Sequence, residues 1–239
     1  KQRKRIGRNS MTHYVRGVLE AGMLWHWPVE RVMGHFDEPV GQDALDVAIN
    51  DGKGLILAAP HCGAWEILNL YLMRYGMGAV LYKPGRLPEI DAALLEKRRR
   101  GGSQMVPATP AGLRTLFKLL KAGQSVALLP DQEPSRGEGQ FAPFLGVEAL
   151  TGVLLPRMAR RTGVPVFFAV CARCKEGRYR VHLFRSDESI HSDDMRIALT
   201  AVNRGIEACI NVDTEQYLWA YKRFRNRPEG EPSFYKNRD

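Results

Sequence analysis

The chain has 239 residues, of which 44% are hydrophobic and 26% are charged. This length and composition predict one globular domain whose core needs no disulfide, and they exclude a disordered tail. The 35 basic residues against 26 acidic ones give a net charge of +9, which favours an anionic partner. The charge does not choose among nucleic acid, a phosphorylated substrate, an acidic protein and a membrane surface.

Apolar runs alternate with helical patterns along the whole chain, which predicts an α/β fold. The expected helices, in chain order, cover residues 11–24, 41–51, 64–76, 89–100, 110–123, 149–163 and 193–210. The expected strands cover residues 54–59, 78–84, 103–108, 124–130, 164–173 and 179–185. No linker separates two parts, so residues 1–239 are expected to form a single domain.

The N-terminus is basic and begins without a methionine, at "KQRKRIGR". We expect that this chain is part of a longer protein and that an N-terminal membrane-anchoring segment is missing from it. A solvated charged terminus is the alternative. No apolar run reaches the roughly 18 residues of a transmembrane helix.

The stretch "LILAAPHCGAWEILNLYL" carries the first candidate chemistry, because a buried strand there runs into a helix. His61 follows the strand, and Glu66 falls in the first helical turn. A carboxylate there can orient the imidazole and raise its basicity, which makes a general base. The N–H groups near Gly63 could bind an oxyanion. Spacing alone favours a plainer alternative, a polar helix cap with a hydrogen-bonded histidine.

Other chemistries have weaker support. The chain has no G-x-S-x-G elbow, P-loop or dinucleotide fingerprint. Cys62 adjoins His61, but neighbouring residues leaving a strand point apart, and cysteine is commonly buried. Cys171 and Cys174 form a lone CxxC without further zinc ligands nearby, and the four cysteines, with Cys209, indicate a reducing compartment. An acidic loop with Asp131 and Glu133 is weak evidence for a metal, so none is expected.

Basic clusters recur at residues 98–100, 157–161 and 222–227. A solvated helix face explains any one of them, but together they favour a diffuse positive surface. Nucleic-acid binding would call for interleaved aromatic residues on a recognition element. "YLWAYKRFR" is the one candidate and carries no RNA-recognition signature, so no nucleic acid is expected.

The stretch around His61 and three further stretches together resemble one family. "PHCGAWEI" resembles the H-x4-D/E motif of the lysophospholipid acyltransferase superfamily, in the form "HFGNWE" of bacterial lipid A biosynthesis acyltransferases. "LLPDQEPSRGEGQFAPFLG" and "LLPRMARRTGVPVFF" are similar to its second block, and "EQYLWAYKRFR" to its closing signature. The blocks stand in family order between residues 53 and 227, so the structural alternative for His61 becomes a minor one.

The resemblance implies a glycerolphosphate-acyltransferase-like fold, with a mixed, mostly parallel sheet flanked by helices. It implies His61 as the base, Glu66 as its charge-relay partner, and Asp131 and Gln132 as part of the pocket. Arg98 fits the family's substrate- or oxyanion-binding arginine best, with Arg99 and Arg100 as competitors. Cys62 stands where the family prefers an aromatic residue, and Ala64 where it prefers Asn, which puts the acceptor's identity in doubt.

The implied reaction moves a fatty acyl chain from acyl carrier protein, or from coenzyme A, to a hydroxyl of a lipid A-type or related glycolipid or lysolipid. It needs no cofactor and no acyl-enzyme. The implied partners are acyl carrier protein, an anionic lipid acceptor and a membrane surface, at the cytoplasmic face of the bacterial inner membrane. The alternatives are a thioester hydrolase and a non-catalytic, basic lipid- or nucleic-acid-binding module on the same fold.

Overall fold

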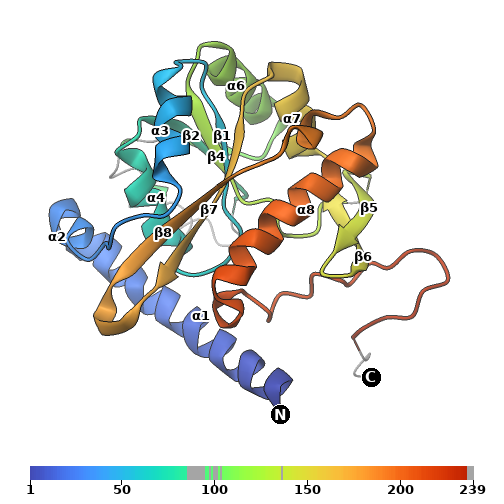
Figure 1. The fold of residues 1–239 in the computed structure, drawn as a ribbon, viewed down its shortest axis with the longest axis horizontal. Helices are drawn as coiled ribbons and strands as arrows, with labels where there is room; N and C mark the ends of the chain where they lie inside the picture. Colours follow the sequence, from blue (N-terminus) through green and yellow to red (C-terminus); the bar gives the residue numbers. More distant parts are fainter. Residues whose placement is uncertain (85–94, 97, 99–101, 103, 136, 236–239) are drawn as a thin grey trace.

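A computed structural model describes residues 1–84, 95–96, 98, 102, 104–135 and 137–235. A six-stranded sheet in the order β3-β2-β4-β1-β7-β8 forms its centre (Figure 1). All neighbouring strands are parallel except β7 and β8, which pair antiparallel. The fold class predicted from the sequence is thereby confirmed, including the mixed but mostly parallel sheet.

The strands of this sheet are β1 (Ile56–Ala58), β2 (Met77–Tyr82), β3 (Gln104–Pro107), β4 (Ser125–Leu128), β7 (Val166–Arg173) and β8 (Tyr179–Arg185). A separate hairpin contains β5 (Gly139–Phe144) and β6 (Val147–Gly152). The helices are α1 (Gln2–His26), α2 (Val29–Met33), α3 (Gln42–Asn50), α4 (Trp65–Met73), α6 (Pro110–Lys121), α7 (Leu154–Thr162) and α8 (Met195–Val212). Short 3₁₀ turns are η2 (Lys175–Gly177), η3 (Glu188–His191) and η4 (Thr214–Gln216).

Two hydrophobic cores lie on opposite faces of the sheet. Ile56 and Ala58 of β1 pack into the core covered by α6, α7 and α8, whereas Leu57 packs into the core covered by α3 and α4. This alternation is what a strand's two-residue period requires when helices cover both faces. The continuous apolar run in β1 therefore follows from its position at the centre of a three-layer α/β/α fold.

The region after residue 138 differs from the prediction. A helix was expected over residues 149–163, but residues 147–152 form β6, and α7 begins only at Leu154. The β5–β6 turn places Leu145 at φ 50° and Gly146 at φ 81°. Two successive left-handed residues are the requirement of a type I′ hairpin turn, which is usually met by Asn-Gly. Leucine in the first position conceals that signal in the sequence.

Two other predicted helices differ in extent from the described ones or lie mostly outside them. The first helix is longer than the expected residues 11–24, because the basic N-terminal segment is helical and α1 begins at Gln2. The expected helix over residues 89–100 lies mostly outside the described residues, although Leu95, Glu96 and Arg98 are helical. Arg99 and Arg100 lie outside the described residues.

The strand order places the candidate chemistry at one edge. β1 and β4 are adjacent and parallel, with Ala58 beside Leu128 in register. The residues that follow the two strands therefore leave the sheet at the same, carboxyl edge, where open α/β sheets form their sites. The His61 turn, residues 59–64 between β1 and α4, and the loop that begins at residue 129 meet there.

Candidate active site

The backbone of the His61 turn is fixed by a glycine that no other residue could replace without strain. Gly63 has φ +63°, and a Cβ at that position would lie 2.1 Å from the carbonyl oxygen of Cys171. The N–H of Gly63 donates to the Gln216 carbonyl at 3.0 Å, and the N–H of Ala64 donates to the Cys171 carbonyl at 2.8 Å. Because β7 and a distant segment both hold the turn, its geometry is set before any substrate binds.

The segment 216–218, which begins at the last residue of η4, lies antiparallel to the His61 turn. The N–H of Leu218 donates to the His61 carbonyl at 3.0 Å. On its other side, α1 holds the same segment, since the Ser10 hydroxyl donates to the Tyr217 carbonyl at 2.6 Å and accepts from the Trp219 N–H at 3.2 Å. One hydrogen-bonded layer therefore separates α1 from the candidate base.

Asp131, and not the expected Glu66, is the carboxylate that holds His61. The His61 Nδ1 lies 2.8 Å from Asp131 Oδ1, and the His61 backbone N–H donates to Oδ2 at 3.0 Å. Two bonds from one carboxylate fix both the main chain and the ring. When Nδ1 carries the proton and donates to Asp131, Nε2 keeps a lone pair and can accept a proton.

The pKa values of the two groups move apart, as in an ion pair. Burial lowers the pKa of His61, but the charge and hydrogen bond of Asp131 outweigh it, so the pKa lies above the ordinary histidine value. Burial raises the pKa of Asp131, but the charge and hydrogen bonds of His61 hold it below its usual range. Asp131 is only 2% exposed and stays ionised near neutral pH. The raised pKa makes the imidazole a stronger base, and the ionised carboxylate orients its ring.

Glu66 instead makes a bidentate ion pair with Arg98. The Nε of Arg98 donates to Glu66 Oε2 at 3.0 Å, and its Nη2 donates to Oε1. Both side chains remain partly exposed, at 20% and 24%. The charge of Glu66 still helps to raise the pKa of His61, while that of Arg98 lowers it. Both residues predicted from the sequence thus lie beside the imidazole, but they pair with each other.

Gln132 approaches the free side of the imidazole. Its Nε2 lies 3.4 Å from His61 Nε2, and its side chain is exposed to solvent. The indole of Trp65 meets the imidazole edge-on, with ring centroids 5.5 Å apart. A donor amide and an aromatic ring therefore flank the imidazole.

The N–H of Gly63 is not free, contrary to the expectation that it binds an oxyanion, because Gln216 already accepts it. The structure leaves other donors at this position. Helix geometry gives the N–H groups of Trp65 and Glu66, in the first turn of α4, no acceptor within the helix. Those groups, the Gln132 amide and the Arg98 guanidinium are N–H donors in the surroundings of His61.

Comparison with known proteins identifies the family. The sequence pattern described as "Bacterial lipid A biosynthesis acyltransferase" matches residues 1–226. The lipid A biosynthesis lauroyltransferase of Escherichia coli K12 is 30% identical over 224 residues, which cover 92% of this chain and 71% of that protein. The chain belongs to the bacterial lipid A biosynthesis acyltransferase family. It is therefore an acyltransferase, as the resemblance implied.

Two further acyltransferases are similar to this lipid A acyltransferase family member. The lipid A biosynthesis palmitoleoyltransferase of the same E. coli strain is 29% identical over 91% of this chain and 71% of that protein. The phosphatidylinositol mannoside acyltransferase of Mycobacterium tuberculosis H37Rv is 25% identical over 60% of this chain and 44% of that protein. The relatives' names therefore span two kinds of acylated glycolipid.

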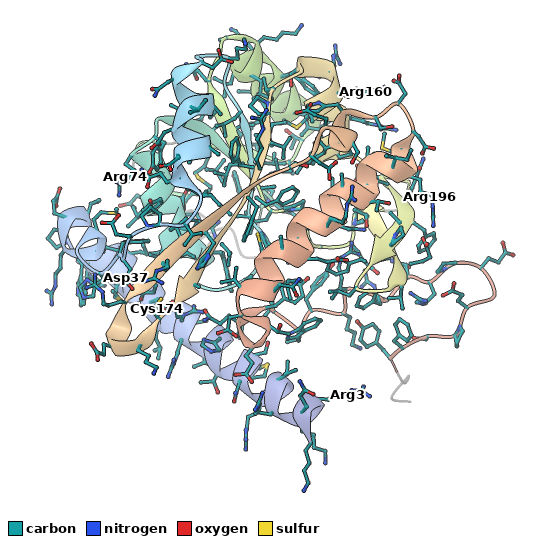
Figure 2. All side chains as sticks on the ribbon, in the orientation of Figure 1. Arg3, Asp37, Arg74, Arg160, Cys174 and Arg196 are labelled. Atoms are coloured by element: carbon teal, nitrogen blue, oxygen red, sulfur yellow. The ribbon has the colours of Figure 1, made fainter. Side chains whose placement is uncertain are left out.

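The cysteines of this family member do not form a nucleophilic centre in the described structure. Burial raises the pKa of Cys62 to about 12, so its thiol stays protonated at neutral pH. Cys171 is buried in β7, whereas Cys174 lies at the exposed tip of the β7–β8 hairpin near Asp37 (Figure 2). Among the described residues, no group of three or more His, Cys, Asp and Glu side chains could hold a metal ion.

Tyr217 is a site residue that residue-level reasoning missed. Its side chain is buried at 2% exposure, and burial together with the charge of Asp131 raises the pKa of the phenol well above the ordinary tyrosine value. The phenol therefore stays protonated in the surroundings of the carboxylate that holds His61. The closing "EQYLWAYKRFR" block contains it, so the resemblance pointed to the segment without giving the contact.

Within the part of the chain that the structure describes, no helix is both long and apolar enough to cross a membrane.

Proposed function

We propose that this acyltransferase moves a fatty acyl chain from an acyl carrier protein thioester to a hydroxyl of a lipid A-type or related glycolipid, with His61 as general base. The observation that carries the proposal is the pairing of His61 Nδ1 with the buried Asp131 carboxylate, which leaves Nε2 directed at Gln132. The names of the relatives support the acceptor class.

In the proposed step, Nε2 of His61 takes the proton of the acceptor hydroxyl. The hydroxyl oxygen attacks the thioester carbonyl carbon and forms a tetrahedral oxyanion, next to the α4 first-turn N–H groups and the Gln132 amide. The carbon–sulfur bond then breaks, and the imidazolium returns its proton to the leaving thiolate. The products are an ester and a free thiol, and no metal or redox cofactor takes part.

A direct transfer, without an acyl-enzyme, fits the surroundings of His61. Cys62 is the adjacent thiol, but it is 1% exposed and its pKa is about 12, so it supplies no thiolate. The net charge of +9 suits an acidic carrier protein and an anionic lipid, with coenzyme A as the alternative donor. Both substrates would meet at the cytoplasmic face of the bacterial inner membrane.

The test measures free thiol released from acyl carrier protein thioester, with and without a Kdo-bearing lipid A precursor. The wild-type protein should release thiol only with the acceptor present, and His61→Ala should lower turnover by about 10³-fold or more at a temperature where circular dichroism shows the variant to be folded. Release without acceptor would identify a thioester hydrolase instead. Near-wild-type turnover by His61→Ala would refute the assignment of the base.

A second measurement addresses the acyl-enzyme. Incubation with the donor alone, followed by mass spectrometry of the intact protein, should show no added acyl mass. An acyl group found on Cys62 would overturn the direct-transfer mechanism.

A further inference from the structure

The longest helix of the described structure, α1, carries a row of large apolar side chains on its solvent side. Large apolar side chains stand on the solvent side of α1 at spacings of three and four residues, which places them on one face: Met11, Tyr14, Val15, Val18 and Leu19. Val18 is 61% exposed and Leu19 is 71% exposed. This face, defined as the α1 stripe, is apolar where a helix on a globular protein is ordinarily polar.

The protein side of α1, by contrast, is fixed by polar contacts. Glu20 accepts two bonds from the Arg173 guanidinium, at 2.8 and 2.7 Å, and a third from the Tyr179 phenol at 3.2 Å. The Asn9 amide donates to Glu215 at 2.8 Å, and Ser10 binds the segment 216–218. These bonds fix the rotation of the helix, because turning the α1 stripe inward would leave buried charges such as Arg173 without partners.

The charge around the α1 stripe indicates what covers it. Lys4 and Arg8 are exposed and precede Met11 at helical spacing, so they continue the line of the stripe toward the N-terminus. Arg3 projects from the same end of the helix (Figure 2). A second copy of the chain would bring two +9 proteins and two basic helix ends together. An anionic lipid surface satisfies both the cationic end and the apolar face.

We propose that α1 lies in the plane of an anionic bilayer, with the α1 stripe at the boundary between headgroups and acyl chains and with Lys4 and Arg8 among the headgroups. The inference deepens the proposed function, on which it rests for the lipid nature of the acceptor. Ser10 and the segment 216–218 connect the other side of α1 to the His61 carbonyl. Docking through the stripe therefore holds the candidate base one layer above the surface from which a lipid hydroxyl would come.

The test is vesicle flotation with protein alone, using vesicles of neutral phosphatidylcholine with and without about a third of phosphatidylglycerol. The wild-type chain should float with the anionic vesicles. The double variant Val18→Asp/Leu19→Asp should lower the partition constant at least about tenfold, because it places two carboxylates in the apolar boundary. Lys4→Glu/Arg8→Glu should lower it by a similar factor on anionic vesicles only.

The matched control is Val47→Asp on α3, since Val47 is 69% exposed and lies outside the stripe. It should bind vesicles as the wild type does. Equal binding by Val47→Asp and the stripe variant would mean that exposed apolar residues act without a specific face, and would overturn the proposal. So would a wild-type chain that stays with the aqueous phase, or one that sediments as a dimer which Val18→Asp dissociates.

Position in the bilayer can be read separately. Lipids brominated on the acyl chain should quench the fluorescence of the tryptophan introduced by Leu19→Trp. They should not quench that of the tryptophan introduced by Val47→Trp. Unquenched fluorescence from Leu19→Trp would contradict the depth assigned to the stripe. None of these measurements needs turnover, so His61→Ala should bind vesicles normally. Failure of the acyl-transfer proposal and failure of this one are therefore distinguishable.

Discussion

Replacing Asp131 by asparagine tests the pairing that separates the structure from the motif. Asparagine keeps the size of the side chain, and its carbonyl oxygen can still accept the His61 backbone N–H, which Asp131 accepts at 3.0 Å. The group facing Nδ1 loses its charge and can become an N–H donor. A donor there favours the tautomer with the proton on Nε2, which removes the lone pair that the proposed base uses.

The magnitude follows from the loss of base function in a buried site. General-base catalysis contributes about 10²–10⁴-fold, and loss of both the charge and the tautomer places this variant at the upper end. We expect kcat to fall by about 10³–10⁴-fold, which is about 4–5.5 kcal/mol in the barrier. Acceptor-dependent thiol release measures it, and circular dichroism with thermal melting establishes that the variant is folded.

The pH dependence provides a signature that a structural defect would not give. Asp131 raises the pKa of His61, so the wild-type acidic limb of kcat/KM should lie above the ordinary histidine value. Without that charge the pKa falls, and the limb of Asp131→Asn should move to lower pH although the plateau is lower.

Stability should show the same coupling. The raised pKa of His61 contributes stability below its unfolded value of about 6.5, which is lost as the pH rises through the folded pKa. The lowered pKa of Asp131 contributes stability above about 3.9, which is lost as the pH falls through its folded pKa. The melting temperature of the variant should therefore fall further below that of the wild type at pH 5.5 than at pH 8.5.

Two results would refute the assignment of Asp131. One is an acidic limb of kcat/KM that stays in place in Asp131→Asn, and the other is a larger loss of kcat in Glu66→Gln than in Asp131→Asn.

Three further substitutions address the rest of the site. Cys62→Ala should keep kcat within about threefold, because a thiol of pKa about 12 is not a nucleophile; a loss above 100-fold would contradict this. Glu66→Gln weakens the pair with Arg98 and should raise KM more than it lowers kcat, as initial-rate kinetics can show. Gly63→Ala should lower stability by about 2 kcal/mol or more in urea unfolding, and Gly76→Ala, also at positive φ but in open space, should cost less.

The local pattern of apolar residues was sufficient to predict the strand and the helix on either side of the base. The apolar run before Pro60 predicts a buried strand, and the helical pattern from residue 64 predicts α4, so His61 had to lie on a strand-to-helix turn. Both elements form within two residues of the predicted limits at their ends nearest His61. Parallel strands expose their carboxyl ends at one edge, which also placed Asp131 near the site.

The partner of His61 could not be predicted in the same way. Glu66 is close in sequence and was preferred for that reason, whereas Asp131 becomes adjacent only because β4 pairs with β1. Strand order is a property of the assembled sheet, and nothing in the residues of β1 states which strand will lie beside it. The free N–H of Gly63 was likewise expected because the sequence does not reveal that residue 216 returns to cap it.

The antiparallel contact between the His61 turn and the segment 216–218 also bears on when the enzyme becomes competent during its synthesis. His61 leaves the ribosome early, but the residues that accept the Gly63 N–H and donate to the His61 carbonyl leave it only after every strand of the sheet. A nascent or prematurely terminated chain would hold its base on a turn with unpaired backbone groups. The backbone of the His61 turn is therefore fully hydrogen-bonded only once the chain has been translated through residue 218.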